Sequence, residues 1–218
     1  MKSRDAYHHG DLRNALVGAA ARLAAGGGPA AVTVRAAARD VGVTPTAAYR
    51  HFANHVALLD AAKHECTRRM AEAMRKRLDA TPAEPDPVRS AVLRLEAIGR
   101  GYVDFAIAEP GLFRTAFCLG EMEGKAEVLT GHKPAGEDVG VDEPHAMLLD
   151  LIDQLVRLGF FTEEQRLGAV VSAWSLVHGL AMLLIEGPLA GVPDDARTAV
   201  IDEALASYSR AFWNAGHH

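Results

Sequence analysis

The chain has 218 residues, of which 49% are hydrophobic and 23% charged, and this balance is typical of a folded soluble protein rather than a disordered tail. Two cysteines are too few for a disulfide framework, and no apolar stretch follows the basic residues at the N-terminus, so we expect a cytoplasmic protein without a secretory signal. The net charge of -5 is uneven, because residues 1–55 hold seven Lys and Arg against three acids, a balance of +4, and the remainder carries -9. This favours contact of the N-terminal part with a polyanion, although an accidental skew of surface charge explains it equally well.

A helical pattern begins close to the N-terminus. The first helix is predicted from about Asp11 to Ala25, where apolar residues recur at helical spacing, and the segment from Gly26 to Pro29 ends it. No alternation of apolar and polar residues is sustained anywhere, so strands are not expected. The sequence predicts an all-α protein of about nine helices, with a three-helix helix-turn-helix domain over residues 1–55 and a larger helical domain over residues 56–218.

Two short helices with a tight turn between them are predicted inside the basic segment. Thr33 is placed to cap a second helix that runs to Asp40, and Gly42 suits the left-handed residue after it. Thr44 followed by Pro45 is an N-cap with a first-turn proline, so a third helix begins there. This arrangement is typical of a helix-turn-helix unit.

Caps and prolines mark the remaining helices. Residues 79–87 contain three prolines and form a linker, and residues 120–143 form a long polar connection with one helical turn near residues 125–129. The markers are Asn54 as N-cap of the fourth helix, Pro87 at the start of the fifth, Leu112 for a short sixth, Leu148 to Leu158 for the seventh, Thr162 and Gln165 as a capping box of the eighth, and Asp194 or Asp195 as N-cap of the ninth.

The predicted eighth helix has one stretch, Leu167 to Ile185, without any charged residue. Its length nearly suffices to span a membrane, but two glycines, two serines and a histidine interrupt it. A helix that is apolar all round in a soluble protein is buried on two faces, commonly by its own core and by a partner subunit. We therefore expect no membrane span and a homodimer.

A longer pattern resembles a known family. Residues 33–52, Thr-Val-Arg-Ala-Ala-Ala-Arg-Asp-Val-Gly-Val-Thr-Pro-Thr-Ala-Ala-Tyr-Arg-His-Phe, resemble the N-terminal signature of the tetracycline-repressor (TetR) family, and the resemblance covers about residues 7–60. Trp174 to Gly179 resembles the Trp-His-Gly element of one subgroup's C-terminal domain, and Tyr7 to Leu12 resembles the opening of that subgroup. The resemblance implies a homodimer that binds a palindromic operator, usually as a repressor, and releases it when a small molecule enters the C-terminal domain.

The predicted recognition helix carries small residues that allow close approach to base edges in a major groove about 12 Å wide. We expect Thr46 and Ala47 to contact bases, and Thr44, Tyr49 and His51 to bond phosphates. For Tyr49 a core ring and a phosphate-bonding hydroxyl both fit. The other DNA-binding candidates are Pro45, Thr33 at a helix N-terminus, the charges of Arg35 and Arg50, and His55, where the family usually has a lysine.

The C-terminal helices supply candidates for an effector site and a dimer interface. Most of these residues are equally explained as plain core, and for His178 a bond to a neighbouring carbonyl is favoured over a ligand contact. The ligand-binding candidates are Tyr102, Phe105, Phe117, Met122, Met147, Leu151, Trp174, His178 and Met182. The dimer-interface candidates are Leu167, Val171, Ile201, Leu205, Tyr208 and Phe212.

Other classes of protein have less support in the sequence. The segment from His64 to Arg68 begins like a zinc-protease HExxH motif but has arginine in place of the second histidine, so we expect no enzyme. Adjacent His8 and His9 lack a third partner at ligand spacing, so we expect neither metal nor cofactor. A helical protein-interaction domain without DNA binding is the alternative. His217 and His218 fit a native end or a tag remnant.

Overall fold

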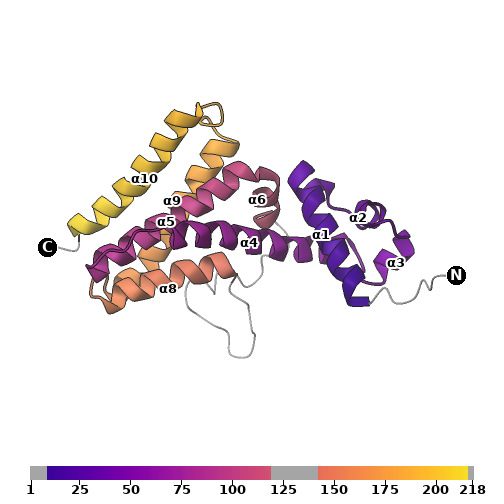
Figure 1. Cartoon of the computed structure of the whole chain (residues 1–218), viewed down its shortest axis with the longest axis horizontal. Coiled ribbons are helices and arrows are strands. Elements are labelled where there is room, and N and C mark those ends of the chain that lie inside the picture. Colours follow the sequence, from indigo (N-terminus) through magenta and orange to yellow (C-terminus); the bar gives the residue numbers. More distant parts are fainter. Residues whose placement is uncertain (1–8, 119–141, 216–218) are drawn as a thin grey trace. The chain divides into compact units, whose positions relative to one another are not determined.

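The computed structural model describes residues 9–118 and 142–215, and within these ranges it contains nine α-helices, one 3-10 turn and no strand (Figure 1). The all-α prediction is confirmed. The connection predicted over residues 120–143 lies almost wholly outside the described residues. The helices are α1 (His9–Gly27), α2 (Val34–Val41), α3 (Pro45–Tyr49), α4 (His55–Asp79), α5 (Pro87–Ala108), α6 (Pro110–Ala116), α8 (Glu143–Arg157), α9 (Glu163–Ile185) and α10 (Asp194–Ala215), with the 3-10 turn at Pro29–Ala31.

The chain forms two compact units that differ from the predicted division at residue 55. The first unit consists of Met1–Thr67 and Glu109–Glu121, and the second of Arg68–Ala108 and Met122–His218. Helix α4 therefore contributes residues to both units, and α6 belongs with the N-terminal helices. Packing between segments distant in sequence sets this division, and no local sequence signal reports it.

The first unit is held together where α6 meets the C-terminal end of α1. A Cβ added at Gly111 would lie 2.2 Å from the carbonyl oxygen of Ala24 and 2.6 Å from that of Ala25. The hydroxyl of Thr115, which is fully buried, donates to the Gly111 carbonyl at 2.8 Å. Glycine permits this approach because it has no Cβ.

Gly111→Ala is expected to destabilise the protein by about 3 kcal/mol, because the added methyl group meets rigid backbone rather than a flexible side chain. Urea unfolding followed by circular dichroism measures the change. The matched control is Gly18→Ala in α1, where a Cβ meets nothing closer than an arginine nitrogen at 3.5 Å. That variant is expected to be as stable as wild type or up to about 1 kcal/mol more stable. Equal stability of Gly111→Ala and wild type would contradict the close approach.

Helix α5 lies at the centre of the second unit and packs against α8, α9 and α10. Small residues bring its neighbours close. A Cβ at Gly99 would lie 3.2 Å from Val177 Cγ1 and 3.3 Å from Leu205 Cδ2, and one at Gly101 would lie 2.6 Å from Met74 Cα. The α4 residues of this unit therefore lie against the α5 backbone.

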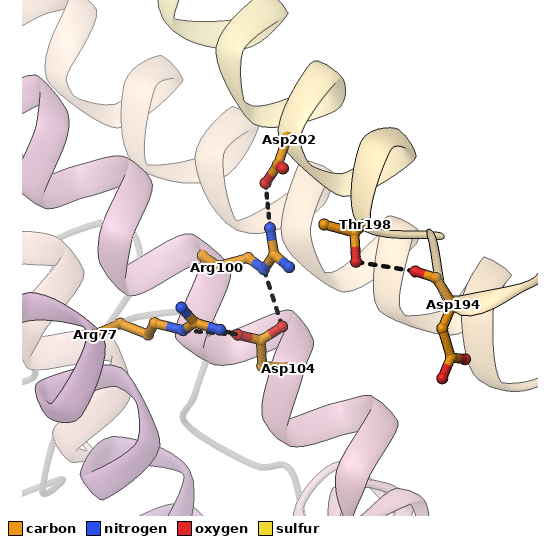
Figure 2. Close-up of polar contacts among 6 residues, drawn as sticks. All are labelled: Arg77, Arg100, Asp104, Asp194, Thr198 and Asp202. Carbon is orange, nitrogen blue, oxygen red and sulfur yellow. Dashed lines mark hydrogen bonds and ion pairs between the residues drawn. The ribbon is translucent and has the colours of Figure 1, made fainter. Parts of the chain in front are cut away.

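Arginine and aspartate side chains join α4, α5 and α10 in the same unit (Figure 2). Asp104 accepts hydrogen bonds from Arg77 Nε at 2.8 Å and from Arg100 Nε at 2.9 Å. Arg100 also pairs with Asp202 of α10. The Arg100 side chain is 19% exposed, so this network is less screened by water than an isolated surface pair.

The predicted caps of α9 and α10 differ in outcome. The capping box is confirmed, because Gln165 N–H donates to Thr162 Oγ1 at 3.3 Å and Thr162 N–H donates to Gln165 Oε1 at 2.9 Å. The N-cap prediction for α10 is wrong. The carbonyl of Pro193 accepts the bond from Arg197 N–H at 2.8 Å, and Asp194 and Asp195 are already inside the first turn, where the helix dipole favours negative charge.

Candidate nucleic-acid interface and effector site

Two threonine caps and a left-handed glycine define the geometry of α2 and α3. Thr33 Oγ1 accepts from Ala36 N–H at 3.1 Å, and Thr44 Oγ1 accepts from Ala47 N–H at 3.2 Å. Gly42 has φ 77° and ends α2, as predicted. Both cap predictions are confirmed, and α3 is a short helix of five residues whose start is fixed by Thr44 and Pro45.

The α2–α3 unit leaves most of the predicted DNA-binding side chains on its surface. Ala47 and His51 are half-buried, and His51 has polar or electrostatic neighbours of its own. The exposed members are Thr33, Arg35, Thr44, Pro45, Thr46, Tyr49, Arg50 and His55. The first turn and outer side of α3 thus present short side chains, the shape that a major groove admits.

The exposure of Tyr49 helps to distinguish a core ring from a phosphate-bonding hydroxyl at this position. Tyr49 is 44% exposed, whereas Phe52 is 2% exposed and lies beneath the guanidinium of Arg13, whose Cζ is 5.1 Å from the ring centroid. Phe52 is therefore a core residue. The exposure of Tyr49 leaves its ring accessible from solvent and favours a surface role for its hydroxyl.

The basic side chains of this unit are not equally available. Arg22 pairs with Asp40 and donates from Nε to it at 3.2 Å. Arg35, Arg39 and Arg50 are exposed. Arg39 is a further exposed cation on α2 that was not among the predicted DNA-binding residues. His55 opens α4, where Asn54 Oδ1 accepts from Ala57 N–H at 2.9 Å and confirms the predicted cap.

A second polar cluster lies among α5, α8 and α9, and it unites three of the predicted ligand-binding residues. The Tyr102 hydroxyl and His178 Nδ1 lie 2.8 Å apart, and the rings of Trp174 and His178 have centroids 6.1 Å apart. A hydroxyl is therefore one partner of His178. Burial raises the pKa of Tyr102 far above its ordinary value, and burial lowers the pKa of His178.

Two further members of this cluster, Asp142 and His145, were not predicted from the sequence. Asp142 caps α8 by accepting from His145 N–H at 3.2 Å, and the same carboxylate oxygen lies 2.6 Å from His145 Nδ1. The His145 ring meets that of Trp174 edge to face, with centroids 4.8 Å apart. The sequence places an aspartate three residues before a histidine at the start of a helix. This spacing is the one expected of an ordinary N-cap, so it does not by itself indicate a polar cluster.

The other predicted ligand-binding residues are dispersed. Phe117 belongs to the first unit, where its ring packs on Phe113 with centroids 4.9 Å apart, and Met122 lies outside the described residues. Phe105 and Leu151 are buried, and Met147 and Met182 are half-buried, in the helices that carry the cluster. A separate groove of about 350 Å³ between α5 and α10, lined by Val92, Leu93 and Ala206 among others, includes none of the predicted residues.

The predicted dimer residues divide into a buried set and an exposed set. Ile201 and Leu205 are buried inside the subunit, and Tyr208 bonds Ala169 O at 3.1 Å, with burial raising its pKa to about 12. The side chain of Phe212 lies outside the described part of the structure. Leu167 and Val171 are each 42% exposed. These two begin a stripe that repeats every four residues along α9 and is exposed throughout, formed by Leu167, Val171, Ser175, Gly179 and Leu183.

Helix α9 is long and apolar enough to cross a membrane by length and composition alone, and only 33% of its most apolar window is buried within the subunit. Core helices of soluble proteins can have the same length and apolar composition. The exposed apolar stripe is of the kind that marks contact sites on protein surfaces.

The chain combines a helix-turn-helix unit at its N-terminus with a larger helical domain, the organisation of a one-component transcription regulator. Residues 16–62 match the family model of bacterial regulatory proteins of the TetR family, and residues 95–208 match the Tetracyclin repressor-like C-terminal domain. The chain belongs to the TetR family. It is thus a transcriptional regulator with a DNA-binding domain and a C-terminal domain, and not an enzyme.

Solved structures share the fold. A protein of unknown function from Rhodococcus sp. RHA1 is 24% identical with a TM-score of 0.68, and the match covers 97% of this chain and 98% of that one. A TetR-family transcriptional regulator from Pectobacterium atrosepticum is 18% identical over 96% and 95% of the two chains, with a TM-score of 0.57. Another from Streptomyces coelicolor is 20% identical over 93% and 83%, with a TM-score of 0.53. No curated protein sequence matches at a significant level.

Proposed function

We propose that this regulator is a repressor that binds a palindromic operator as a homodimer and leaves it when a small molecule binds the C-terminal domain. The observation that carries the proposal is the surface of α3, where Thr44, Pro45 and Thr46 are exposed at a helix start held by a side-chain cap and Tyr49 is exposed at the helix end. A short helix with small exposed residues fits the major groove and reads base edges through its first turn.

The dimer is supported by the exposed stripe of α9. Association through this stripe would bury Leu167, Val171 and Leu183, which are otherwise unusually exposed for large apolar side chains. No atom of the described residues lies within 4 Å of a Cβ added at Gly179, so none of their side chains covers the stripe there. Two subunits related by a two-fold axis would place two recognition helices on half-sites about one DNA turn apart, roughly 34 to 36 Å.

Release by a ligand requires that the second unit influence the first. Helix α4 contributes residues to both, and its C-terminal part is fixed to α5 by the Met74–Gly101 approach and the Arg77–Asp104 ion pair. We infer that a ligand which displaces α5 alters the spacing of the two recognition helices through α4. The ligand then lowers operator affinity to the extent that it prefers the altered spacing.

Tyr49→Phe tests the DNA-binding role of this surface. Loss of one phosphate hydrogen bond is expected to weaken binding to every duplex by about 3- to 10-fold, and to leave the salt dependence unchanged because the lost group is neutral. Arg50→Gln is the comparison, since removal of a cation at a phosphate lowers the slope of log K against log salt by about 1. Fluorescence anisotropy at rising KCl, with circular dichroism as the folding control, measures both.

Full retention of affinity by Tyr49→Phe would remove the phosphate contact from the proposal. The alternative of a protein-interaction domain predicts that wild-type protein shows no salt-dependent binding to duplex DNA in this titration. The family assignment, which includes a DNA-binding domain, favours the regulator.

A further inference from the structure

Two buried polar atoms in the second unit lack hydrogen-bond partners. Among the described residues, the side-chain nitrogens His145 Nε2 and Trp174 Nε1 are buried and unsatisfied. Burial has the larger effect on the pKa of the Tyr102 hydroxyl and the nearby indole N–H of Trp174 lowers it, but these two groups do not meet with hydrogen-bond geometry. Each buried group left unpaired costs about 1 to 3 kcal/mol, so a molecule that forms hydrogen bonds with both groups would be stabilised here.

The chemistry of the two atoms is complementary. The Asp142 carboxylate accepts from His145 Nδ1 at 2.6 Å, so the neutral form of this imidazole carries its proton on Nδ1 and has a lone pair on Nε2. Trp174 Nε1–H is a donor only. The two rings meet edge to face with centroids 4.8 Å apart. The two neighbouring rings thus offer one acceptor and one donor.

The rest of the cluster is already satisfied. The Tyr102 hydroxyl pairs with His178 Nδ1, and His178 lies at 6.1 Å, centroid to centroid, from Trp174. The rings of Tyr102 and His178 therefore lie in the same cluster as the unsatisfied pair, and an apolar or aromatic ligand body would pack well against them.

We propose that His145 and Trp174 bind the hydroxyl group of a neutral phenolic ligand, with the hydroxyl donating to His145 Nε2 and accepting from Trp174 Nε1–H. The inference rests on the proposed function, because it names the chemical class of the effector. A hydroxyl is the smallest group that supplies both partners from one atom. A phenol donates more strongly than an alkyl alcohol to an imidazole that a carboxylate orients.

Charge argues against an anionic ligand at this pair. The five side chains of the cluster, Asp142, His145, Trp174, Tyr102 and His178, include one carboxylate and no lysine or arginine. A carboxylate ligand would face the Asp142 charge in a buried site without a matched cation among these residues. A methyl ether could accept from Trp174 but would leave His145 Nε2 unpaired.

The test uses the two tryptophans of the chain, Trp174 and Trp213. In full-length Trp213→Phe protein labelled with 15N-tryptophan, the single indole N–H signal reports Trp174 directly. Phenol, anisole and benzoate are titrated as size-matched probes to about 10 mM, a range suited to ligands of so few atoms. We expect phenol to shift the indole signal downfield and saturably, with anisole and benzoate at least tenfold weaker.

His145→Asn is the matched variant, since it keeps a polar side chain but removes the Nε2 acceptor at this position. It is expected to weaken phenol binding at least tenfold while the circular dichroism spectrum stays unchanged. A second variant, His145→Gln, keeps the test valid if the first does not fold. Equal or tighter binding of benzoate overturns the ligand class, and no shift with any probe means that water satisfies the pair and overturns the site. DNA binding of the same preparation without probe reports separately on the proposed function.

Discussion

Val171→Asp is expected to convert the dimer into a monomer and to lower operator affinity by about a hundredfold or more, because two half-sites are then no longer bound together. Val171 is the second residue of the exposed α9 stripe and is 42% exposed in the single subunit. A two-fold interface brings the same patch of both subunits together, so one substitution introduces two carboxylates into an apolar contact. Sedimentation equilibrium measures the mass, and anisotropy measures the affinity.

The control for this substitution is Leu93→Asp on α5. Leu93 is 36% exposed, a similar large apolar residue on the same unit but outside the stripe. The variant is expected to remain dimeric and to bind the operator as wild type does. A dimeric Val171→Asp, or a Leu93→Asp that becomes monomeric, would show that the subunits associate through another face.

Thr46→Glu is expected to have the second large effect, a loss of about a hundredfold in DNA affinity. Thr46 is exposed on the first turn of α3 and makes none of the cap bonds, which Thr44 supplies. A carboxylate there approaches the phosphates and base edges that the helix must meet, and a lost base contact alone is worth about 1 to 3 kcal/mol. Fold and dimer are expected to be unchanged.

Ala30→Glu supplies the matched change of charge in the same unit. Ala30 is exposed in the 3-10 turn between α1 and α2, away from α3 in the sequence. Its affinity for DNA is expected to stay within about threefold of wild type, as for a remote surface charge. If both glutamates weaken binding equally, net charge rather than the position of α3 controls the affinity.

Local signals in the sequence predicted the DNA-binding unit well. Thr33, Gly42, Thr44 and Asn54 each take the predicted position, because an N-cap or a left-handed turn is decided by a residue and its neighbours within a single turn of helix. The same holds for the capping box of α9. The N-cap prediction for Asp194 was wrong because Pro193 occupies the position before the first turn of α10, and its carbonyl accepts the first helical hydrogen bond.

Features that depend on contacts between distant segments were not predictable in this way. The approach of Gly111 to Ala24 joins α6 to the first unit, and it places Phe117 in a different unit from Tyr102. His145 reaches Trp174 only through the packing of α8 against α9. Apolar periodicity likewise does not separate Ile201, which faces the core of its own subunit, from Val171, which faces solvent.

The central claim is that two subunits place α3 in successive major grooves of one duplex, and operator selection measures it most directly. Wild-type protein is used to enrich duplexes from a random-sequence pool, and the enriched sequences are read and footprinted. Binding by a two-fold dimer predicts an inverted repeat. The centres of its half-sites are separated by about 10 base pairs or a multiple of that, and both half-sites are protected in the major groove. Enrichment of a single half-site without symmetry, or no enrichment at all, would contradict it.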